Sequence, residues 1–356
     1  MAGIRSIGWW VPDRRQSARE IARDYGLAED ALAGIGLISK PVPGADDHPS
    51  TMGARATRAA LEAAGLEVND LDLLIFAGVS KDWPSPWVAA FGVLHELGST
   101  RSAGFDLSSR CAGVIDALWL ARVLVEAGTY RNVAVVCAER FDYLMGPHRR
   151  PEVVSDAIFG AGAATAIVSR EAGNHIAGFA SMTNRDLSVH KASGPIAGGS
   201  RRPLGEAAMS DGLHLWRGQL SMRDADEIAR YSADADRHNY AELYRQAGFE
   251  AVDFVACSPF YPEPQLRVLE ELGIARESTL FTIPHLGHIG GADLLLILGV
   301  AISCGRPVGR RIVMSLRTNV YSNALAIRGT ADGPGIAAGG EGIDLTLWRS
   351  QPGASG

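Results

Sequence analysis

The chain has 356 residues, 47% of them hydrophobic and 21% charged, a composition typical of a soluble globular protein that needs no disulfides or metals to bury a core. The net charge of −6 argues against nucleic acid as a partner. No apolar run approaches the roughly 20 residues that a membrane helix needs, so we expect no membrane association.

The four cysteines are far apart and form no CxxC pair, which argues against a zinc site or a redox motif. The N-terminal segment lacks the basic start and apolar core of a signal peptide. Scattered cysteines without a signal peptide predict a reducing compartment, so we expect a cytoplasmic protein with no bound metal. The cysteines are Cys111, Cys137, Cys257 and Cys304.

Apolar runs and amphipathic helical stretches alternate along the first half of the chain. This alternation predicts parallel sheets that are covered by helices on both faces. The expected strands are LDLLIFAG (71–78), GFDLSS (104–109), VAVVCAE (133–139) and AATAIVS (163–169), and the strongest expected helix is CAGVIDALWLARVLVEAG (111–128).

The second half repeats the same order of elements. The segment VDFVAC (252–257) matches 71–78, TLFTIPHLGH (279–288) matches the strand that ends near Cys111, and HIGGADLLLILGVAISCG matches the helix after it. Residues 111 and 288 are 177 positions apart, as are residues 128 and 305. Two copies of this length indicate a duplicated α/β unit with pseudo-twofold symmetry, since solenoid repeats are much shorter.

The repeat predicts four parts of the chain. Residues 1–170 form the first half and residues 236–328 the second. The region 171–235 has no counterpart in the repeat, so we expect an insertion that caps the substrate site. Residues 329–356 are rich in glycine, and we expect a mobile tail.

Cys111 and His288 occupy matching positions at the starts of two buried helices. If a pseudo-twofold axis relates the halves, the two helix N-termini meet and the two side chains converge. A helix N-terminus favours a thiolate over a thiol. A neighbouring imidazole can take the proton and return it, and the Cys111 N–H can help to bind an oxyanion. The sequence therefore predicts nucleophilic acyl chemistry at Cys111.

Several segments resemble the ketoacyl synthase III enzymes, the initiating condensing enzymes of fatty-acid and polyketide synthesis. The segment DLSSRCAGVIDALWLA resembles their nucleophile segment, and IPHLGHIGGADLLLILG resembles the segment that carries their catalytic asparagine. The likeness runs from about residue 3 to residue 328. It implies a thiolase-like fold, a duplicated αβαβα layered sandwich, with no cofactor beyond a coenzyme A or acyl carrier protein thioester as donor.

The sequence departs from this family at the expected catalytic set. The family's histidine position holds Ser258, or Cys257 if the register slips by one, and its asparagine position holds His288. The resemblance therefore implies the set Cys111, Ser258 and His288. His285 competes with His288 as the base.

Two further residues are candidates for binding the substrate. The loop that normally supplies a second oxyanion N–H reads SLRTNVYSN, which places Asn319 at a glycine position. The resemblance also places Trp87 where it can shape the acyl tunnel. The Trp and Arg that commonly clamp the adenine of coenzyme A have no counterpart in DALAGIGLISK, which hints at a carrier protein as the donor.

Three functions remain open at this point. The first is an acyltransferase of polyketide, antibiotic or other specialised metabolism, which passes an acyl group through Cys111 to a small-molecule or carrier-bound acceptor. The second is decarboxylative C–C condensation. The third is a non-catalytic partner subunit of a related synthase. The resemblance also implies a homodimer through the sheet that contains the strand at 105–109.

Overall fold

A computed structural model describes most of the chain in atomic detail. For 194–195, 216–217 and 222–229 it describes the backbone alone. The described residues are 1–28, 30–84, 86–143, 157–184, 194–195, 216–217, 222–318, 321–331 and 333–349.

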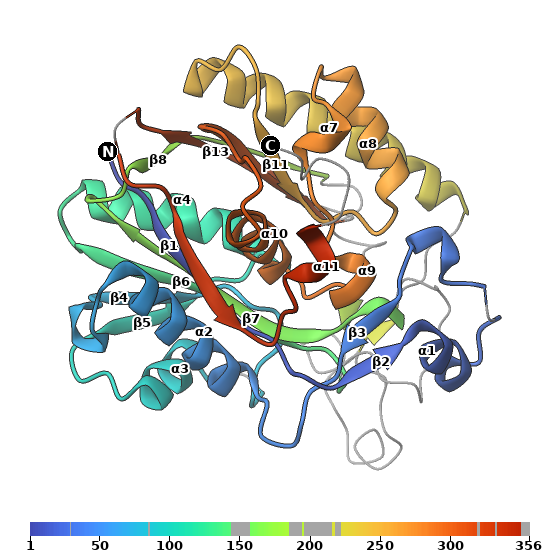
Figure 1. Cartoon of the computed structure of the whole chain (residues 1–356), viewed down its shortest axis with the longest axis horizontal. Helices are drawn as coiled ribbons and strands as arrows, with labels where there is room; N and C mark the ends of the chain where they lie inside the picture. Colours follow the sequence, from blue (N-terminus) through green and yellow to red (C-terminus); the bar gives the residue numbers. More distant parts are fainter. Residues whose placement is uncertain are drawn as a thin grey trace.

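The described elements form five layers in the order helix, sheet, helix, sheet, helix (Figure 1). The central layer consists of α4 (Gly113–Glu126) and α10 (Ala292–Ser303). One outer layer consists of α2 (Pro49–Ala64) and α3 (Ala89–Leu97), and the other of α7 (Met222–Ala247) and α8 (Pro262–Glu271). This is the thiolase-like sandwich that the sequence analysis expected.

The first half contributes five strands to the sheet, in the order β5-β4-β6-β7-β1. The strand β4 pairs in parallel with both β5 and β6, while β7 is antiparallel to both β6 and β1. Their bounds are β1 Gly3–Trp10, β4 Leu73–Phe76, β5 Ala103–Asp106, β6 Asn132–Arg140 and β7 Ala161–Ser169.

The second half repeats this pairing in the order β11-β12-β13-β8. The pair β11 and β12 is parallel, and β13 is antiparallel to both β12 and β8, so β8 takes the place that β1 has in the first half. The two halves of the sheet join through Gly3 and His175. The bounds are β8 Asn174–Thr183, β11 Phe254–Cys257, β12 Arg311–Arg317 and β13 Tyr321–Gly329.

Three segments differ from the expectations. Residues 174–183, which were expected in the unpaired region 171–235, form β8 and thus belong to the second sheet. The strand expected at 279 is reduced to one bridge between Thr279 and Val255, the counterpart of the pairing of β5 with β4. The tail is ordered through β14 (Ala337–Glu341), which pairs in parallel with β1, and through the fully buried Trp348 in α11 (Thr346–Arg349).

A smaller group of elements packs together beside β7. It contains β2 (Arg15–Ser17), α1 (Ala18–Tyr25), β3 (Ser39–Pro41) and α9 (Ile283–Leu286). The strands β9 (Gly194–Pro195) and β10 (Trp216–Arg217) pair with each other. None of the helices in the described ranges is both long and apolar enough to cross a membrane.

Candidate active site

The first half of the site is the turn between β5 and α4. Arg110 has a φ of 58°, and Ser109 and Cys111 face each other across it as an isolated bridge. Cys111 is half-buried at the start of α4, directly before the helix N-cap Ala112. The side-chain amide of Asn323 in β13 donates to the Ala112 carbonyl over 2.9 Å, so a strand of the second half holds the helix start that carries Cys111.

The second half of the site is the turn between α9 and α10. Gly287 has a φ of 62°, which a residue with a Cβ adopts only at a cost, and the chain then runs through His288. The His288 N–H donates to the Ile158 carbonyl over 2.9 Å, and the Gly160 N–H donates to the His288 carbonyl over 3.0 Å. Backbone bonds on both sides therefore fix this turn against the strand that leads into β7.

The two helix starts meet, as the internal repeat predicted. A Cβ added to Gly291, the N-cap of α10, would lie 2.5 Å from the Cys111 carbonyl oxygen, so only glycine allows this approach. Cys111 interacts with the His288 side chain and raises its pKa. His288 is 4% exposed, and its ring packs against those of Phe159 and Phe260 at centroid distances of 5.1 and 4.9 Å.

A third residue, Asp293, contacts His288. The sequence analysis did not identify it. Its side chain is fully buried in the first turn of α10. The Nδ1–H of His288 donates to Asp293 Oδ2 over 2.6 Å, while Oδ1 accepts the Ile289 N–H at 2.8 Å. Burial alone lowers the pKa of His288, but the charge and hydrogen bond of Asp293, together with those of Cys111, raise it to about 10.

Ser258 lies beside this set of contacting side chains, and its own contact is with Asp293. Its hydroxyl donates to the same oxygen, Asp293 Oδ2, that binds His288. The Cys257 thiol is buried next to the Thr279 hydroxyl, and burial raises its pKa to about 12. The structure thus places Ser258 behind the imidazole, as a support for the carboxylate.

The internal repeat contained a signal for Asp293. Asp293 follows His288 by five residues, and Asp116 follows Cys111 by five residues. The two acids therefore occupy matching places in α10 and α4. Asp116 accepts hydrogen bonds from Tyr321 and Asn323, whereas Asp293 accepts them from Ser258 and His288.

Glu139, at the end of β6, is a second buried carboxyl near the start of α10. It accepts the N–H groups of Val79 and Ser80 and the Ser80 hydroxyl, at 2.8, 2.9 and 2.7 Å. A Cβ on Gly290 would lie 2.8 Å from Glu139 Oε1. Burial raises the pKa of Glu139 to about 7, against the lowering effect of these hydrogen bonds.

The other candidate residues have different places. Asn319 lies outside the described residues. The Trp87 ring packs over Gly92 of α3 and against the buried cluster that α2 and α3 form with strands of the first half. His285 packs against Trp348 at a centroid distance of 5.4 Å. In the described ranges no cluster of His, Cys, Asp and Glu could hold a metal ion.

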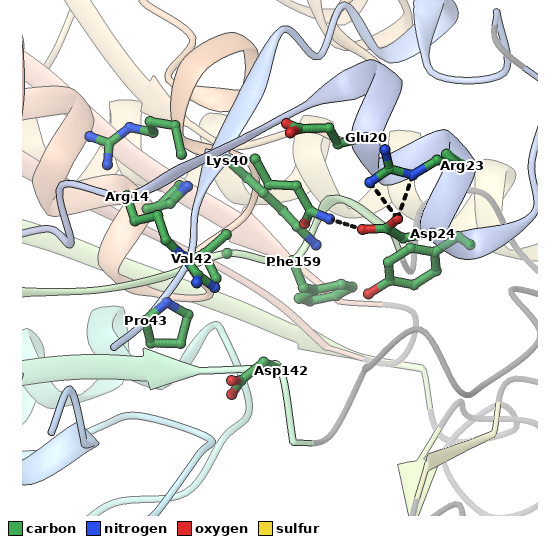
Figure 2. Close-up of a pocket in the computed structure, with 14 residues that line it drawn as sticks. Arg14, Glu20, Arg23, Asp24, Lys40, Val42, Pro43, Asp142 and Phe159 are labelled. Carbon is green, nitrogen blue, oxygen red and sulfur yellow. Dashed lines mark hydrogen bonds and ion pairs between the residues drawn. The ribbon is translucent and has the colours of Figure 1, made fainter. Parts of the chain in front are cut away.

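A cavity of about 490 Å³ has Phe159 in its lining (Figure 2), and the Phe159 ring packs against that of His288. Residues of β2, α1 and β3 line it, and many of them are charged. The Lys40 Nζ donates to the Ala157 carbonyl over 2.7 Å, and burial lowers the pKa of this amine to about 8 in spite of Asp142. The cavity therefore suits a polar molecule better than an alkyl chain.

Comparisons with known proteins agree with this architecture. The family model for 3-oxoacyl-[acyl-carrier-protein] synthase III matches residues 105–185. The chain is 29% identical to the acetoacetyl CoA synthase NphT7 of Streptomyces sp. over 312 residues, covering 85% of this chain and 90% of that protein. It is 24% identical to the β-ketoacyl-[acyl-carrier-protein] synthase III of Campylobacter jejuni over 310 residues, covering 86% and 90%.

Solved structures share the fold at lower identity. The 3-oxoacyl-(acyl carrier protein) synthase III of Pseudomonas aeruginosa superposes with a TM-score of 0.78 at 19% identity, covering 94% of this chain and 99% of that chain. OleA of Xanthomonas campestris gives a TM-score of 0.77 at 16% identity, covering 92% and 98%. At these identities the likeness concerns the fold alone.

Proposed function

We propose that the chain is a ketoacyl synthase III-like acyltransferase that carries the acyl group on Cys111, because its sequence and its fold are similar to those of this group. The observation that carries the proposal is the meeting of the two helix starts, which brings Cys111 to the turn of His288, whose imidazole is held by Asp293. A nucleophile, a base and a group that orients the base form the arrangement that serves acyl transfer on several unrelated folds.

In the first half-reaction the Cys111 thiolate attacks the carbonyl carbon of the donor thioester. The S–C bond to Cys111 forms, the bond to the donor sulfur breaks, and the leaving thiolate takes the proton of the His288 imidazolium. The high pKa of His288, about 10, keeps this proton available at neutral pH.

In the second half-reaction the neutral His288 takes a proton from the acceptor hydroxyl, amine or thiol. The acceptor attacks the acyl carbon, Cys111 leaves as a thiolate, and the imidazolium is restored. Asp293 holds the Nδ1–H of His288 throughout, so the other ring nitrogen is the one that exchanges the proton with Cys111 and the acceptor. Ser258 helps to hold the Asp293 carboxylate.

The charged cavity beyond Phe159 supports a polar acceptor. Its lining includes Arg14, Arg23, Asp24, Lys40 and Asp142, and the Phe159 ring at its wall contacts His288. We expect the exchange Arg14→Glu at the exposed rim to change the preference among acceptors while Cys111 acylation keeps its rate. If the variant and the parent protein show the same acceptor preference, the acceptor binds outside this cavity.

The donor is a coenzyme A or carrier-protein thioester, and the missing adenine clamp in DALAGIGLISK favours the carrier protein. A role in polyketide or antibiotic biosynthesis fits the replacement of the family's His-Asn pair by Ser258 and His288. Comparing acylation rates with an acyl group on coenzyme A and on a phosphopantetheinyl carrier tests the donor. A faster reaction with coenzyme A would overturn the carrier assignment.

Intact-protein mass spectrometry with a panel of acyl thioesters tests the proposed function. We expect one acyl mass to add to the protein and to disappear in Cys111→Ala. The matched control is Cys304→Ala, which removes another incompletely buried thiol, one that contacts the Leu345 carbonyl. Equal labelling of Cys111→Ala and the parent protein would refute an acyl-Cys111 intermediate.

Decarboxylative condensation is the second candidate, and the relatives favour it because they carry synthase names. Condensation requires positioned donors that stabilise the enolate formed from a malonyl unit. In this chain one of the two usual donor positions holds Ser258, whose hydroxyl donates its hydrogen bond to Asp293. Acyl transfer without release of carbon dioxide from a malonyl thioester supports our proposal, and release of carbon dioxide would favour condensation.

A partner-subunit role makes a different prediction. In that case Cys111 stays unacylated in the isolated protein with every donor, and acylation appears only when a homologous chain is added. Acylation of the purified chain alone excludes this alternative.

A homodimer through the β5 edge is the assembly that the family membership supports. β5 ends the sheet order, and Phe91 on the neighbouring α3 is 58% exposed. Light scattering after size exclusion should give twice the chain mass of 37.8 kDa, and Phe91→Glu should give the single mass. A monomeric parent protein would refute this assembly.

A further inference from the structure

The His288 ring has an aromatic side chain on each of two sides. The rings of Phe159 and Phe260 meet it at interplanar angles of 70° and 72°, with centroid distances of 5.1 and 4.9 Å. These distances are typical of favourable aromatic contacts. With Asp293 at Nδ1 and the two rings beside it, only 4% of His288 is exposed.

Phe260 is held beside the imidazole by further neighbours. Its ring packs against that of Phe159 at a centroid distance of 5.8 Å, and Phe159 packs against the buried Phe141 at 4.8 Å. Phe260 also packs against the buried cluster that includes Ile21 of α1 and Ile283 of α9. These contacts come from both halves of the chain and keep the ring next to His288.

Phe260 lies in the same loop as Ser258. β11 ends at Cys257 and α8 begins at Pro262, so both residues belong to one short connection. Ser258 donates a hydrogen bond to Asp293, while Phe260 packs on His288. One loop thus supports the carboxylate that orients the base and places an apolar ring against the base itself.

A base that activates an acceptor can also activate water. A water molecule beside the neutral His288 would give up a proton to the imidazole and attack the acyl carbon on Cys111. The new C–O bond forms, the bond to the Cys111 sulfur breaks, and the thiolate leaves beside the imidazolium. The acyl group is then released as a carboxylic acid and is lost to the acceptor. Exclusion of water from the base prevents this side reaction.

We propose that Phe260 is a specificity-determining residue that keeps water from His288, so that acyl-Cys111 reacts with the acceptor and is not hydrolysed. The inference rests on the proposed function in that Cys111 carries the acyl group. A space left by the Phe260 ring would adjoin the polar imidazole, and a cavity with a polar wall is one that water enters.

Loss of the acyl group from Cys111 without an acceptor tests this role. The protein is acylated with a coenzyme A or carrier-protein thioester, freed of excess donor by desalting, and followed by intact-protein mass spectrometry. The variants are Phe260→Ala and Phe260→Leu. The matched control is Phe249→Ala, which removes the same ring from a buried cluster of the second half, beside Arg328.

We expect Phe260→Ala to lose its acyl group at least about tenfold faster than the parent protein, a part of the roughly 10²–10⁴-fold that a positioned base contributes. Phe260→Leu keeps an apolar side chain and should stay within about threefold, and Phe249→Ala within about twofold. The added rate in Phe260→Ala should fall in deuterium oxide, because His288 moves a proton in that step.

A second measurement needs no acylation. The Cε1 hydrogen of His288 exchanges with deuterium oxide when solvent reaches the ring, and mass spectrometry with fragment ions that separate His288 from His285 follows it. We expect faster exchange in Phe260→Ala than in the parent protein and in Phe249→Ala. The exposed His238 of α7 is the internal reference and should not change.

Two results would overturn the inference when Cys111 is acylated. One is an acyl lifetime of Phe260→Ala within about twofold of the parent protein, and the other is a faster loss that does not slow in deuterium oxide. If no donor acylates Cys111, the proposed function fails, and the exchange of His288 alone decides whether Phe260 excludes water. Unchanged exchange in Phe260→Ala then overturns the inference as well.

Discussion

The starts of α4 and α10 are the same structural feature made twice, and they differ in what surrounds them. Cys111 at the start of α4 is half-buried, whereas His288 before α10 is 4% exposed. The turn before α10 uses glycines at its positive φ positions, Gly287 and Gly290, and the turn before α4 uses Arg110. The turn before Cys111 therefore contains a strained residue, and the turn before His288 uses glycine instead.

The acid in each first turn has a different task. Asp116 joins α4 to β13 through Asn323 and Tyr321, while Asp293 orients His288. Both halves therefore carry an aspartate at the matching position of the helix. In the first half it fixes a helix, and in the second it sets the tautomer and charge of an imidazole.

The largest expected effect separates His288 from Ser258. His288→Ala should slow acylation of Cys111 by about 10³-fold, because the proton exchange with the thiol is lost. Ser258→Ala should slow it less than about tenfold, since it removes one of several bonds to Asp293. Rapid-quench mass spectrometry measures both rates, and equal effects would mean that the base is assigned wrongly.

The next comparison tests whether the two matching aspartates, Asp293 and Asp116, have different roles. Asp293→Asn should slow acylation by about 10²-fold, because the amide no longer favours the imidazolium. Asp116→Asn should change this rate less than about tenfold and act mainly on thermal stability. Comparable rate losses in the two variants would indicate that the acids share one role.

The contact between the helix starts gives a matched pair of glycine substitutions. A Cβ on Gly291 meets the Cys111 carbonyl at 2.5 Å, whereas the nearest atom to a Cβ on Gly113 lies at 3.4 Å. Gly291→Ala should lower the free energy of unfolding by about 1–3 kcal/mol through overpacking. Gly113→Ala should be neutral or stabilise by up to about 1 kcal/mol. Denaturant titration measures both, and a stable Gly291→Ala variant would mean that the helix starts can separate.

The smallest effect concerns the Glu139 carboxyl. Its pKa is raised from 4.5 to about 7, so between these values the native protein keeps a proton that the unfolded chain has lost. The free energy of unfolding therefore falls as the pH rises from 4.5 to 7, by at most about 1.4 kcal/mol per pH unit. Glu139→Gln should flatten this part of the profile. An unchanged slope would assign the titration to another group.

The sequence predicted the pair Cys111 and His288 because the two helices of the repeat begin 177 residues apart and also end 177 residues apart. Hydrophobic periodicity likewise located the central strands and both buried helices. Each of these features occurs in both halves of the sequence, so the pattern in one half supports the element predicted in the other.

Other features depend on contacts that a single sequence does not display. The sequence analysis did not single out Asp293, because its place beside the imidazole depends on a hydrogen bond to His288. β8 was missed because NHIAGFASMT mixes apolar, small and polar residues and is not the continuous apolar run of the other central strands. The glycine-rich tail was expected to be mobile, yet β14 forms by backbone pairing with β1, which requires no apolar side chains.

The position of β1 has a consequence for how the chain is synthesised and folds. β1 is synthesised before both of its neighbours in the sheet, β7 and β14, and its pairing with β14 joins Ser6 to the distant Ala337. β1 therefore completes its pairing only after both sheet halves have been made. Such long sequence separations slow folding and leave a growing chain exposed to wrong partners.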